Sequence, residues 1–179
     1  IREDIEQLTF YRENGLIKSS KEEIYRQSDI VTIHTPLWAH KELKELENPA
    51  IAEIYKKLGI IKSDPSSIEV TEDMIKAKEL AMMKKDSYLI NAARAKIVNE
   101  ADLLEALKNG IIAGAGLDVY TQEDTPWENE TLAELISLNN VYTTPHIGGT
   151  SKEGSQALGI AAIEGLKEYY HIKDKELIF

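Results

Sequence analysis

Short apolar runs alternate along the chain with longer segments in which apolar residues recur at a helical period. The runs at residues 30–34, 88–91, 111–119 and 141–144 predict four strands; the first is rich in β-branched residues, and the third is unusually rich in small ones. Helices are predicted at about 21–27, 72–83, 100–108, 131–138 and 151–170, and residues 2–14 form a further helix-like segment. This alternation predicts an α/β fold, in which right-handed crossovers build a doubly wound parallel sheet with helices on both faces.

End signals support three of these elements. Ser20, with Glu23 three residues later, forms a capping box at the start of a helix. Asn99 is suited to cap the helix at 100–108, and Asn109 followed by Gly110 ends it. His34 lies inside the first predicted strand, so we expect it to be a satisfied core residue. Residues 38–70 differ in composition, with lysines and glutamates alternating around a short apolar stretch, and they predict one surface helix and a loop.

Chemistry-bearing residues follow the predicted strands. Arg94 comes after the second strand, Asp118 and Glu123 after the third, and His146 after the fourth. Each alone is weak evidence, since a loop arginine is more often a surface charge and an aspartate at a strand end more often caps a turn. However, ligands of open parallel sheets bind at the carboxyl ends of the strands. The convergence of these four residues at one sheet edge therefore favours a functional site there.

The chemistry of this set suits a hydroxy acid. A carboxylate beside a histidine stabilises the imidazolium, which makes that histidine a general acid and base. An arginine can hold a substrate carboxylate in a bidentate manner and polarise the adjacent carbonyl. The residues thus fit the interconversion of a 2-hydroxy acid and a 2-oxo acid, and the hydride would need a cofactor.

Composition excludes other classes. The 179 residues include 31 acidic and 21 basic side chains, a net charge of −10, which disfavours nucleic-acid binding. No cysteine is present, so disulfides and zinc-thiolate sites are excluded. No apolar run reaches the roughly 20 residues of a membrane span, so we expect a soluble, cytoplasmic protein without a membrane partner. Gly114 and Gly116 lack the third glycine of a phosphate-binding turn, and we expect them to allow close packing inside a strand.

Four ordered motifs carry a family resemblance. They are SDIVTIHTPL at 28–37, MKKDSYLINAAR at 83–94, AGAGLDV at 113–119 and NVYTTPHIGG at 140–149. Together they resemble the NAD-binding domain of the D-isomer-specific 2-hydroxyacid dehydrogenases. The resemblance implies a Rossmann-like fold and hydride transfer between NAD and a small D-2-hydroxy or 2-oxo acid. It does not distinguish phosphoglycerate, glycerate and lactate as substrates, nor NAD from NADP.

The resemblance also implies residue roles. Arg94 would bind the substrate, His146 would be the acid and base, and Glu123 would pair with His146. Asp118 resembles the family residue that contacts the nicotinamide carboxamide. The NAD groove would be lined by Thr35, Pro36, Ala92, Ala93, Arg94, His146 and Gly149. Related formate dehydrogenases usually have glutamine at the position of Glu123, which favours a hydroxy acid over formate.

The sequence departs from the family pattern at several places. Ala95 replaces the glycine after the arginine, and Asp124 replaces the proline after the glutamate; both change loop stiffness. Residues 38–70 extend a crossover by about 25–30 residues and are interpreted as an insertion, either a surface decoration, a lid or an oligomer contact. The family's first strand, its glycine-rich turn and its substrate domain of about 100 residues are expected before Ile1.

Residues 1–179 are therefore interpreted as the C-terminal part of a dinucleotide-binding domain, without the substrate domain. The intact protein is expected to be a homodimer, and the chain alone is expected to bind NAD negligibly because it lacks the glycine turn. Two alternatives stay open: a dinucleotide-binding scaffold or corepressor of the same fold, and an inactive fragment.

Overall fold

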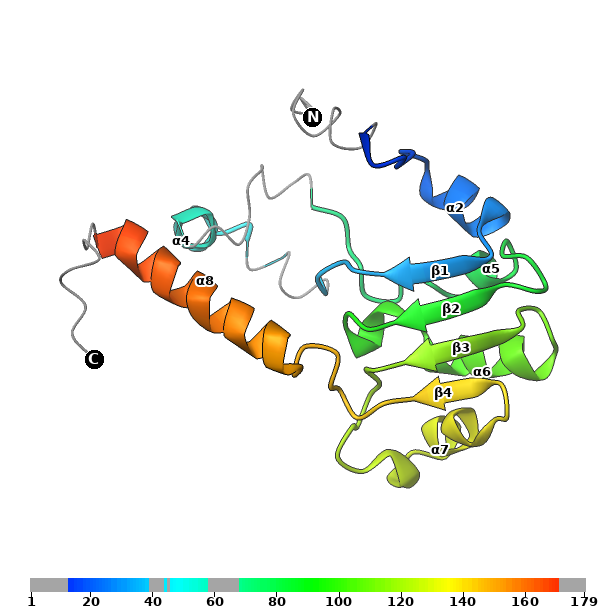
Figure 1. Ribbon diagram of the computed structural model, residues 1–179. Helices are drawn as coiled ribbons and strands as arrows, with labels where there is room; N and C mark the ends of the chain where they lie inside the picture. Colours follow the sequence, from blue (N-terminus) through cyan, green and yellow to red (C-terminus); the bar gives the residue numbers. More distant parts are fainter. Residues whose placement is uncertain (1–12, 39–43, 45, 58–67, 171–179) are drawn as a thin grey trace.

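The chain folds around a four-stranded parallel sheet (Figure 1). The computed structural model describes residues 13–38, 44, 46–57 and 68–170. The strands pair in chain order and are β1 (Ile30–Ile33), β2 (Tyr88–Asn91), β3 (Gly114–Leu117) and β4 (Val141–Thr143). Their last residues are in register, with Ile33 beside Asn91, Asn91 beside Leu117, and Leu117 beside Thr143. This confirms the four predicted strands, and the loops that follow them meet at one edge.

Two of the described helices, α2 and α6, begin where the sequence predicts a cap. They are α2 (Lys21–Gln27), α4 (Pro49–Lys57), α5 (Ala77–Leu80), α6 (Glu100–Lys108), α7 (Glu130–Ser137) and α8 (Lys152–Tyr170), with 3-10 turns η2 (Ala95–Ile97) and η3 (Pro126–Glu128). The capping box of Ser20 and Glu23 is present at α2. Asn99 accepts the Asp102 N–H at the start of α6, and Gly110 takes a φ of +64° after its end.

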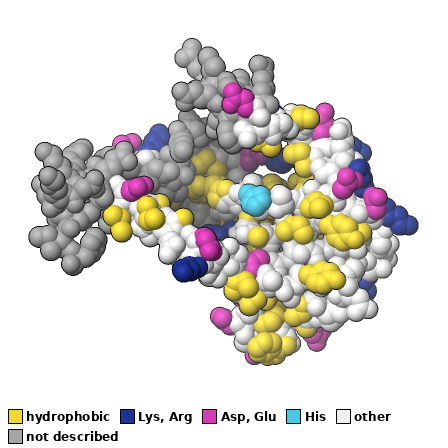
Figure 2. All heavy atoms as spheres, in the orientation of Figure 1, with side chains coloured by type: hydrophobic (Ala, Val, Ile, Leu, Met, Phe, Trp, Pro, Cys, Tyr) yellow, Lys and Arg dark blue, Asp and Glu magenta, His cyan; other side chains and the backbone are white. Residues whose placement is uncertain are grey.

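The core lies on one face of the sheet. Leu89 of β2 and Leu117 of β3 pack there with leucines of α6 and α7. The predicted α/β fold with a parallel sheet is confirmed, and the face opposite the core is open in the described residues, where Ile30, Tyr88 and Tyr142 are exposed. Figure 2 shows hydrophobic side chains gathered over this open face.

Two glycines let neighbouring groups come close to β3. A Cβ on Gly116 would lie 2.9 Å from Cδ1 of Ile90, and one on Gly114 would lie 2.7 Å from the Asn140 carbonyl oxygen. The predicted packing role of these glycines is confirmed. On the open face, the Tyr88 ring also lies against Gly114.

Two elements are shorter than the sequence predicts. The helix expected at 72–83 is reduced to α5, because Ile75 is extended and forms a parallel bridge with Val98. Ile75 is also fully buried, so tertiary packing overrides the local helical pattern. The strand expected at 111–119 spans only β3.

His34 is exposed, against the expectation of a core residue. It follows β1 on the side of the open face, where its Nε2 lies 3.0 Å from the Thr32 hydroxyl. Thr32, two positions earlier, is exposed as well, so alternation along the strand places His34 on the exposed side and does not bury it.

Several predicted segments lie partly outside the described residues. The helix-like segment at 2–14 falls there apart from its last two positions. Within 38–70 the predicted surface helix is confirmed as α4, while most of the predicted loop is outside the described residues. The terminal helix is confirmed as α8, whose Leu158 and Ile160 are exposed. Among the described helices, none combines the length and apolarity needed to cross a bilayer.

Candidate active site

A histidine and a glutamate meet at the carboxyl edge of the sheet. Nδ1 of His146, in the loop after β4, lies 2.8 Å from Oε2 of Glu123, in the loop after β3. The pair is accessible, because the side chains of His146 and Glu123 are 50% and 36% exposed. Since Nδ1 faces the carboxylate, Nε2 is the ring nitrogen left for a substrate.

His146 occupies a left-handed backbone conformation with a φ of +53°. Such a conformation is uncommon for a residue other than glycine and persists only where the surroundings impose it. Gln122, directly before Glu123, has a similar φ of +52°. Both members of the pair are therefore presented by constrained turns.

Asp118 holds the loop that carries His146. Its carboxylate accepts the Thr144 hydroxyl at 2.5 Å, the Ile147 N–H at 2.9 Å and the Gly148 N–H at 2.8 Å. These donors lie on both sides of His146 in the sequence. A Cβ on Gly148 would lie 2.9 Å from Oδ2 of Asp118, so the close approach needs a glycine at this position.

The same contacts set the ionisation of Asp118. Burial alone would raise its pKa. The hydrogen bonds from Thr144 and from two backbone N–H groups, with the nearby His146, outweigh burial and hold the pKa of Asp118 below its ordinary value. The carboxylate is thus stabilised in its charged form, in which it can accept all three donors.

Arg94 lies in the loop after β2, and the side chain of Asn91, rather than Asp118, holds the backbone of this loop. Asn91, almost fully buried, donates from Nδ2 to the Arg94 carbonyl at 3.0 Å and accepts the Ala93 N–H at 3.2 Å. Arg94 itself is exposed, and its Nη1 donates to the Ala93 carbonyl at 2.7 Å. Within the described residues, no carboxylate lies within ion-pair distance of the Arg94 guanidinium, so its charge is available to an anion.

The predicted cofactor residues occupy neighbouring strand ends. The Thr35 hydroxyl is buried and, among the described residues, is the one buried side-chain polar atom without a hydrogen-bond partner. An unpaired buried hydroxyl is a position that a polar ligand atom can satisfy. The Pro36 carbonyl, by contrast, already accepts the Thr71 hydroxyl at 2.7 Å.

Small residues complete this edge. Ala92 and Ala93 follow β2, and nothing lies within 4 Å of a Cβ built on Gly149. No bulky side chain stands at these three positions. The unpaired hydroxyl and the small loop residues fit one end of a dinucleotide.

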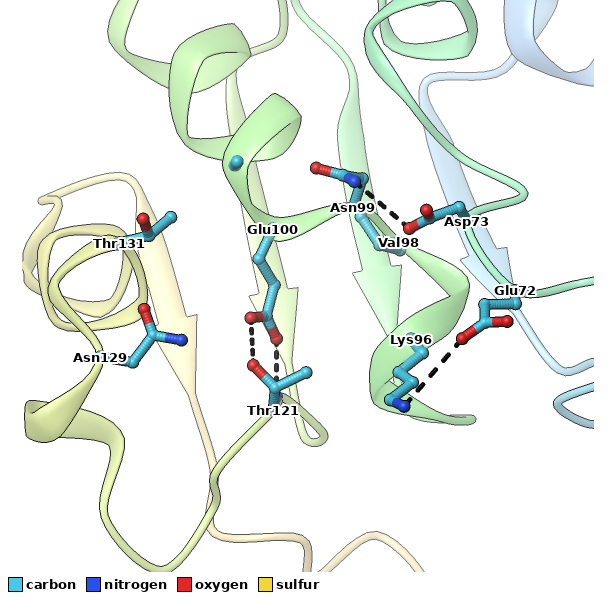
Figure 3. A pocket seen from close by; sticks show the side chains of 10 residues that line it. Glu72, Asp73, Lys96, Val98, Asn99, Glu100, Thr121, Asn129 and Thr131 are labelled. Carbon is cyan, nitrogen blue, oxygen red and sulfur yellow. Dashed lines mark hydrogen bonds and ion pairs between the residues drawn. The ribbon is translucent and has the colours of Figure 1, made fainter. Parts of the chain in front are cut away.

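A cavity of about 320 Å³ lies next to this edge but contains none of the predicted site residues (Figure 3). Its lining includes Lys96, Glu100, Thr121 and Asn129. Sequence reasoning named neither Glu100 nor Thr121, although they bond to each other there. No local motif marks such a pair, because the two residues are brought together by the fold.

Comparison with protein families identifies the chain. Residues 40–148 match the family described as D-isomer specific 2-hydroxyacid dehydrogenase, NAD binding domain. The chain therefore belongs to the D-isomer specific 2-hydroxyacid dehydrogenase family, whose NAD-binding domain has the Rossmann-like fold predicted above. NAD is the cofactor of this family.

Individual relatives agree with this assignment. The chain is 34% identical over 149 residues to D-3-phosphoglycerate dehydrogenase 1 of Saccharomyces cerevisiae, covering 79% of this chain and 30% of the relative. It is 32% identical over 168 residues to glycerate dehydrogenase of Methylorubrum extorquens, covering 94% of this chain and 43% of the relative. The chain thus spans less than half the length of these relatives.

A solved structure shows the same fold. The NAD-complexed D-isomer specific 2-hydroxyacid dehydrogenase of Lactobacillus delbrueckii ssp. bulgaricus superposes with a TM-score of 0.64 at 26% identity. The match covers 99% of this chain and 47% of that one.

Proposed function

We propose that the protein carrying this chain transfers a hydride between NAD and a small D-2-hydroxy acid or 2-oxo acid. The observation that carries the proposal is the 2.8 Å contact between His146 and Glu123 at the carboxyl edge of an NAD-binding domain. The relatives named for phosphoglycerate and glycerate support a small carboxylate-bearing substrate.

The substrate carboxylate is assigned to Arg94. A guanidinium offers two parallel donors that match a carboxylate, and Arg94 is exposed at a strand end. From that position it also polarises the carbonyl next to the carboxylate. Against a net charge of −10, a local cation is what an anionic substrate requires.

Proton transfer is assigned to His146. During oxidation Nε2 takes the proton of the substrate hydroxyl, and during reduction it returns that proton to the carbonyl oxygen. Glu123 accepts the Nδ1–H, which fixes the ring and stabilises the imidazolium that forms.

When bound, NAD supplies the acceptor for the hydride that leaves C2 of the hydroxy acid. The residues proposed to hold it are Thr35, Pro36, Ala92, Ala93, Arg94, Asp118, His146 and Gly149. The unpaired Thr35 hydroxyl supports this assignment most directly.

The test is a screen of NADH oxidation by the intact protein with glyoxylate, pyruvate, hydroxypyruvate and phosphohydroxypyruvate. We expect turnover with at least one of these acids and its loss in His146→Ala. Tight NADH binding without turnover on any acid would contradict the proposal and favour a binding scaffold, which no observation on this chain supports at present.

We also propose the organisation of the intact protein. Residues 38–70 are an insertion in the C-terminal part of a dinucleotide-binding domain, and the protein is a cytoplasmic homodimer that binds neither nucleic acid nor membranes. The net charge of −10 and the absence of cysteine support the partner and compartment assignments. Size-exclusion chromatography with light scattering tests the dimer, and a monomeric mass would contradict it.

A further inference from the structure

Glu100 is the first residue of α6, and the helix does not use its carboxylate as a cap. The capping role belongs to Asn99, whose side chain accepts the Asp102 N–H. Glu100 instead reaches the loop after β3, where Oε1 accepts the Thr121 N–H at 2.6 Å and Oε2 accepts the Thr121 hydroxyl at 2.5 Å. Figure 3 shows the two side chains joined by this pair of bonds at the wall of the cavity.

The Glu100 carboxylate is committed to Thr121. Within the described residues Glu100 makes no ion pair, while the nearby Lys96 lies 4.0 Å from Glu72. Charge-assisted hydrogen bonds are stronger than neutral ones, and two on one residue fix its orientation. We call this pair of bonds the Glu100–Thr121 clasp.

The clasp lies directly before the acid–base pair. Thr121 precedes Gln122, whose φ is +52°, and Glu123 follows. At the start of the same loop the Asp118 N–H donates to the Asn91 carbonyl at 2.9 Å. The loop is thus fixed at Asp118 and again at Thr121, and the constrained turn at Gln122 begins from the second fixed point.

We propose that Glu100 is a positioning residue: through Thr121 it holds the loop so that Glu123 meets Nδ1 of His146. This inference rests on the proposed function, because it concerns the proton-transfer pair of that reaction. Displacements of about 1 Å at a reacting group can cost 10²-fold in rate. A carboxylate that holds this turn therefore affects the reaction without touching substrate.

The test reads the tautomer of His146 in the 179-residue chain by ¹⁵N NMR of the ring, at a pH where the imidazole is neutral. Wild-type His146 is expected to carry its proton on Nδ1, the nitrogen that faces Glu123. Glu123→Ala, which removes the acceptor, defines the signal of a broken pair. Glu100→Ala is expected to move the signal toward that state, and Glu100→Gln, which can still accept and donate at Thr121, is expected to stay near wild type.

Asp102→Ala is the matched control. Asp102 lies in the same first turn of α6 and also accepts a backbone N–H from another segment, that of Ala77 at 2.8 Å. Its loss should lower stability without changing the His146 tautomer. If Glu100→Ala does not fold, two variants of Thr121 replace it. Thr121→Val removes only the hydroxyl bond and Thr121→Ser keeps it, so the His146 tautomers of these two variants then test the inference.

In the intact protein, Glu100→Ala is expected to lower kcat by about 10-fold to 100-fold with little change in KM. An unchanged tautomer in folded Glu100→Ala or Thr121→Val would overturn the inference. Equal shifts in Glu100→Ala and Glu100→Gln would also overturn it, because charge rather than geometry would then be the cause. Absence of turnover in wild type would refute the proposed function and leave the tautomer result independent of it.

Discussion

The loops after β4 and β2 carry His146 and Arg94 but are built differently. The β4 loop is tied to Asp118 by three hydrogen bonds, and it fixes His146 in a left-handed conformation against Glu123. The β2 loop is held by two bonds from Asn91, and it leaves the Arg94 guanidinium exposed. The contacts of the β4 loop fix the side chain of His146, whereas those of the β2 loop fix only the backbone around Arg94.

This difference follows from the chemistry assigned to each side chain. An acid–base group needs a fixed ring and a fixed tautomer before substrate arrives. A substrate-binding arginine needs an unpaired charge, which an internal carboxylate would neutralise. We therefore expect changes in the β4 loop to lower kcat and changes in the β2 loop to raise KM.

The largest effect is expected from His146→Ala. Loss of general acid–base catalysis typically costs about 10²-fold to 10⁴-fold in rate. We expect kcat for the best oxo acid to fall by that amount while KM changes little, measured by steady-state NADH oxidation. A KM effect that exceeds the kcat effect would place His146 in binding instead.

The next largest effect is expected from Arg94→Gln. A hydrogen bond to a charged group is worth about 1.5–3 kcal/mol, so KM should rise by about 10-fold to 100-fold. Arg94→Lys should recover part of the loss, because an ammonium keeps the charge without the bidentate geometry. Lys96→Gln, which removes an exposed cation two residues away, is the control. The assignment fails if both glutamine variants raise KM equally.

Asp118→Asn is expected to destabilise the fold by about 1.5–3 kcal/mol at neutral pH. The folded pKa of Asp118 is below its ordinary value, so its contribution is present above the unfolded pKa and is lost as pH falls through the folded pKa. The wild-type advantage should therefore shrink below about pH 4. Denaturant unfolding of both proteins between pH 3 and pH 7, as an assay range, measures this, and a pH-independent difference would contradict it.

The smallest effect is expected from Asn91→Ala, which loosens the β2 loop without removing Arg94. The lost bonds and the buried cavity should cost about 1–3 kcal/mol of stability. KM should rise less than in Arg94→Gln, and kcat should stay near wild type. A fall in kcat like that of a β4-loop variant would remove the contrast between the two loops.

Local signals in the sequence predicted most of the elements. The capping box at Ser20 and the cap at Asn99 placed helix starts correctly, and the strand runs placed the four parallel strands. The helix at 72–83 was overestimated because Ile75 pairs with Val98, a contact that depends on distant packing. The exposure of His34 likewise depends on which face of the sheet is covered.

The sequence predicted which residues gather at the site, but not the backbone conformations and hydrogen bonds that hold them there. Order along the strands placed Glu123 and His146 at one edge, and the structure brings them into contact. The roles of the predicted residues stay predictions. The left-handed turns, the three bonds to Asp118 and the Glu100–Thr121 clasp come from tertiary contacts, and no local pattern reports them.

The central claim is that Glu123 and His146 act together in proton transfer. The most direct measurement is kcat/KM against pH for oxo-acid reduction by wild type, Glu123→Gln and the exposed control Glu128→Gln. Reduction takes a proton from His146, and Glu123 stabilises and orients the ring that gives it, so Glu123→Gln should lower kcat/KM across the profile while Glu128→Gln stays near wild type. A profile that is the same in wild type and Glu123→Gln would contradict the account.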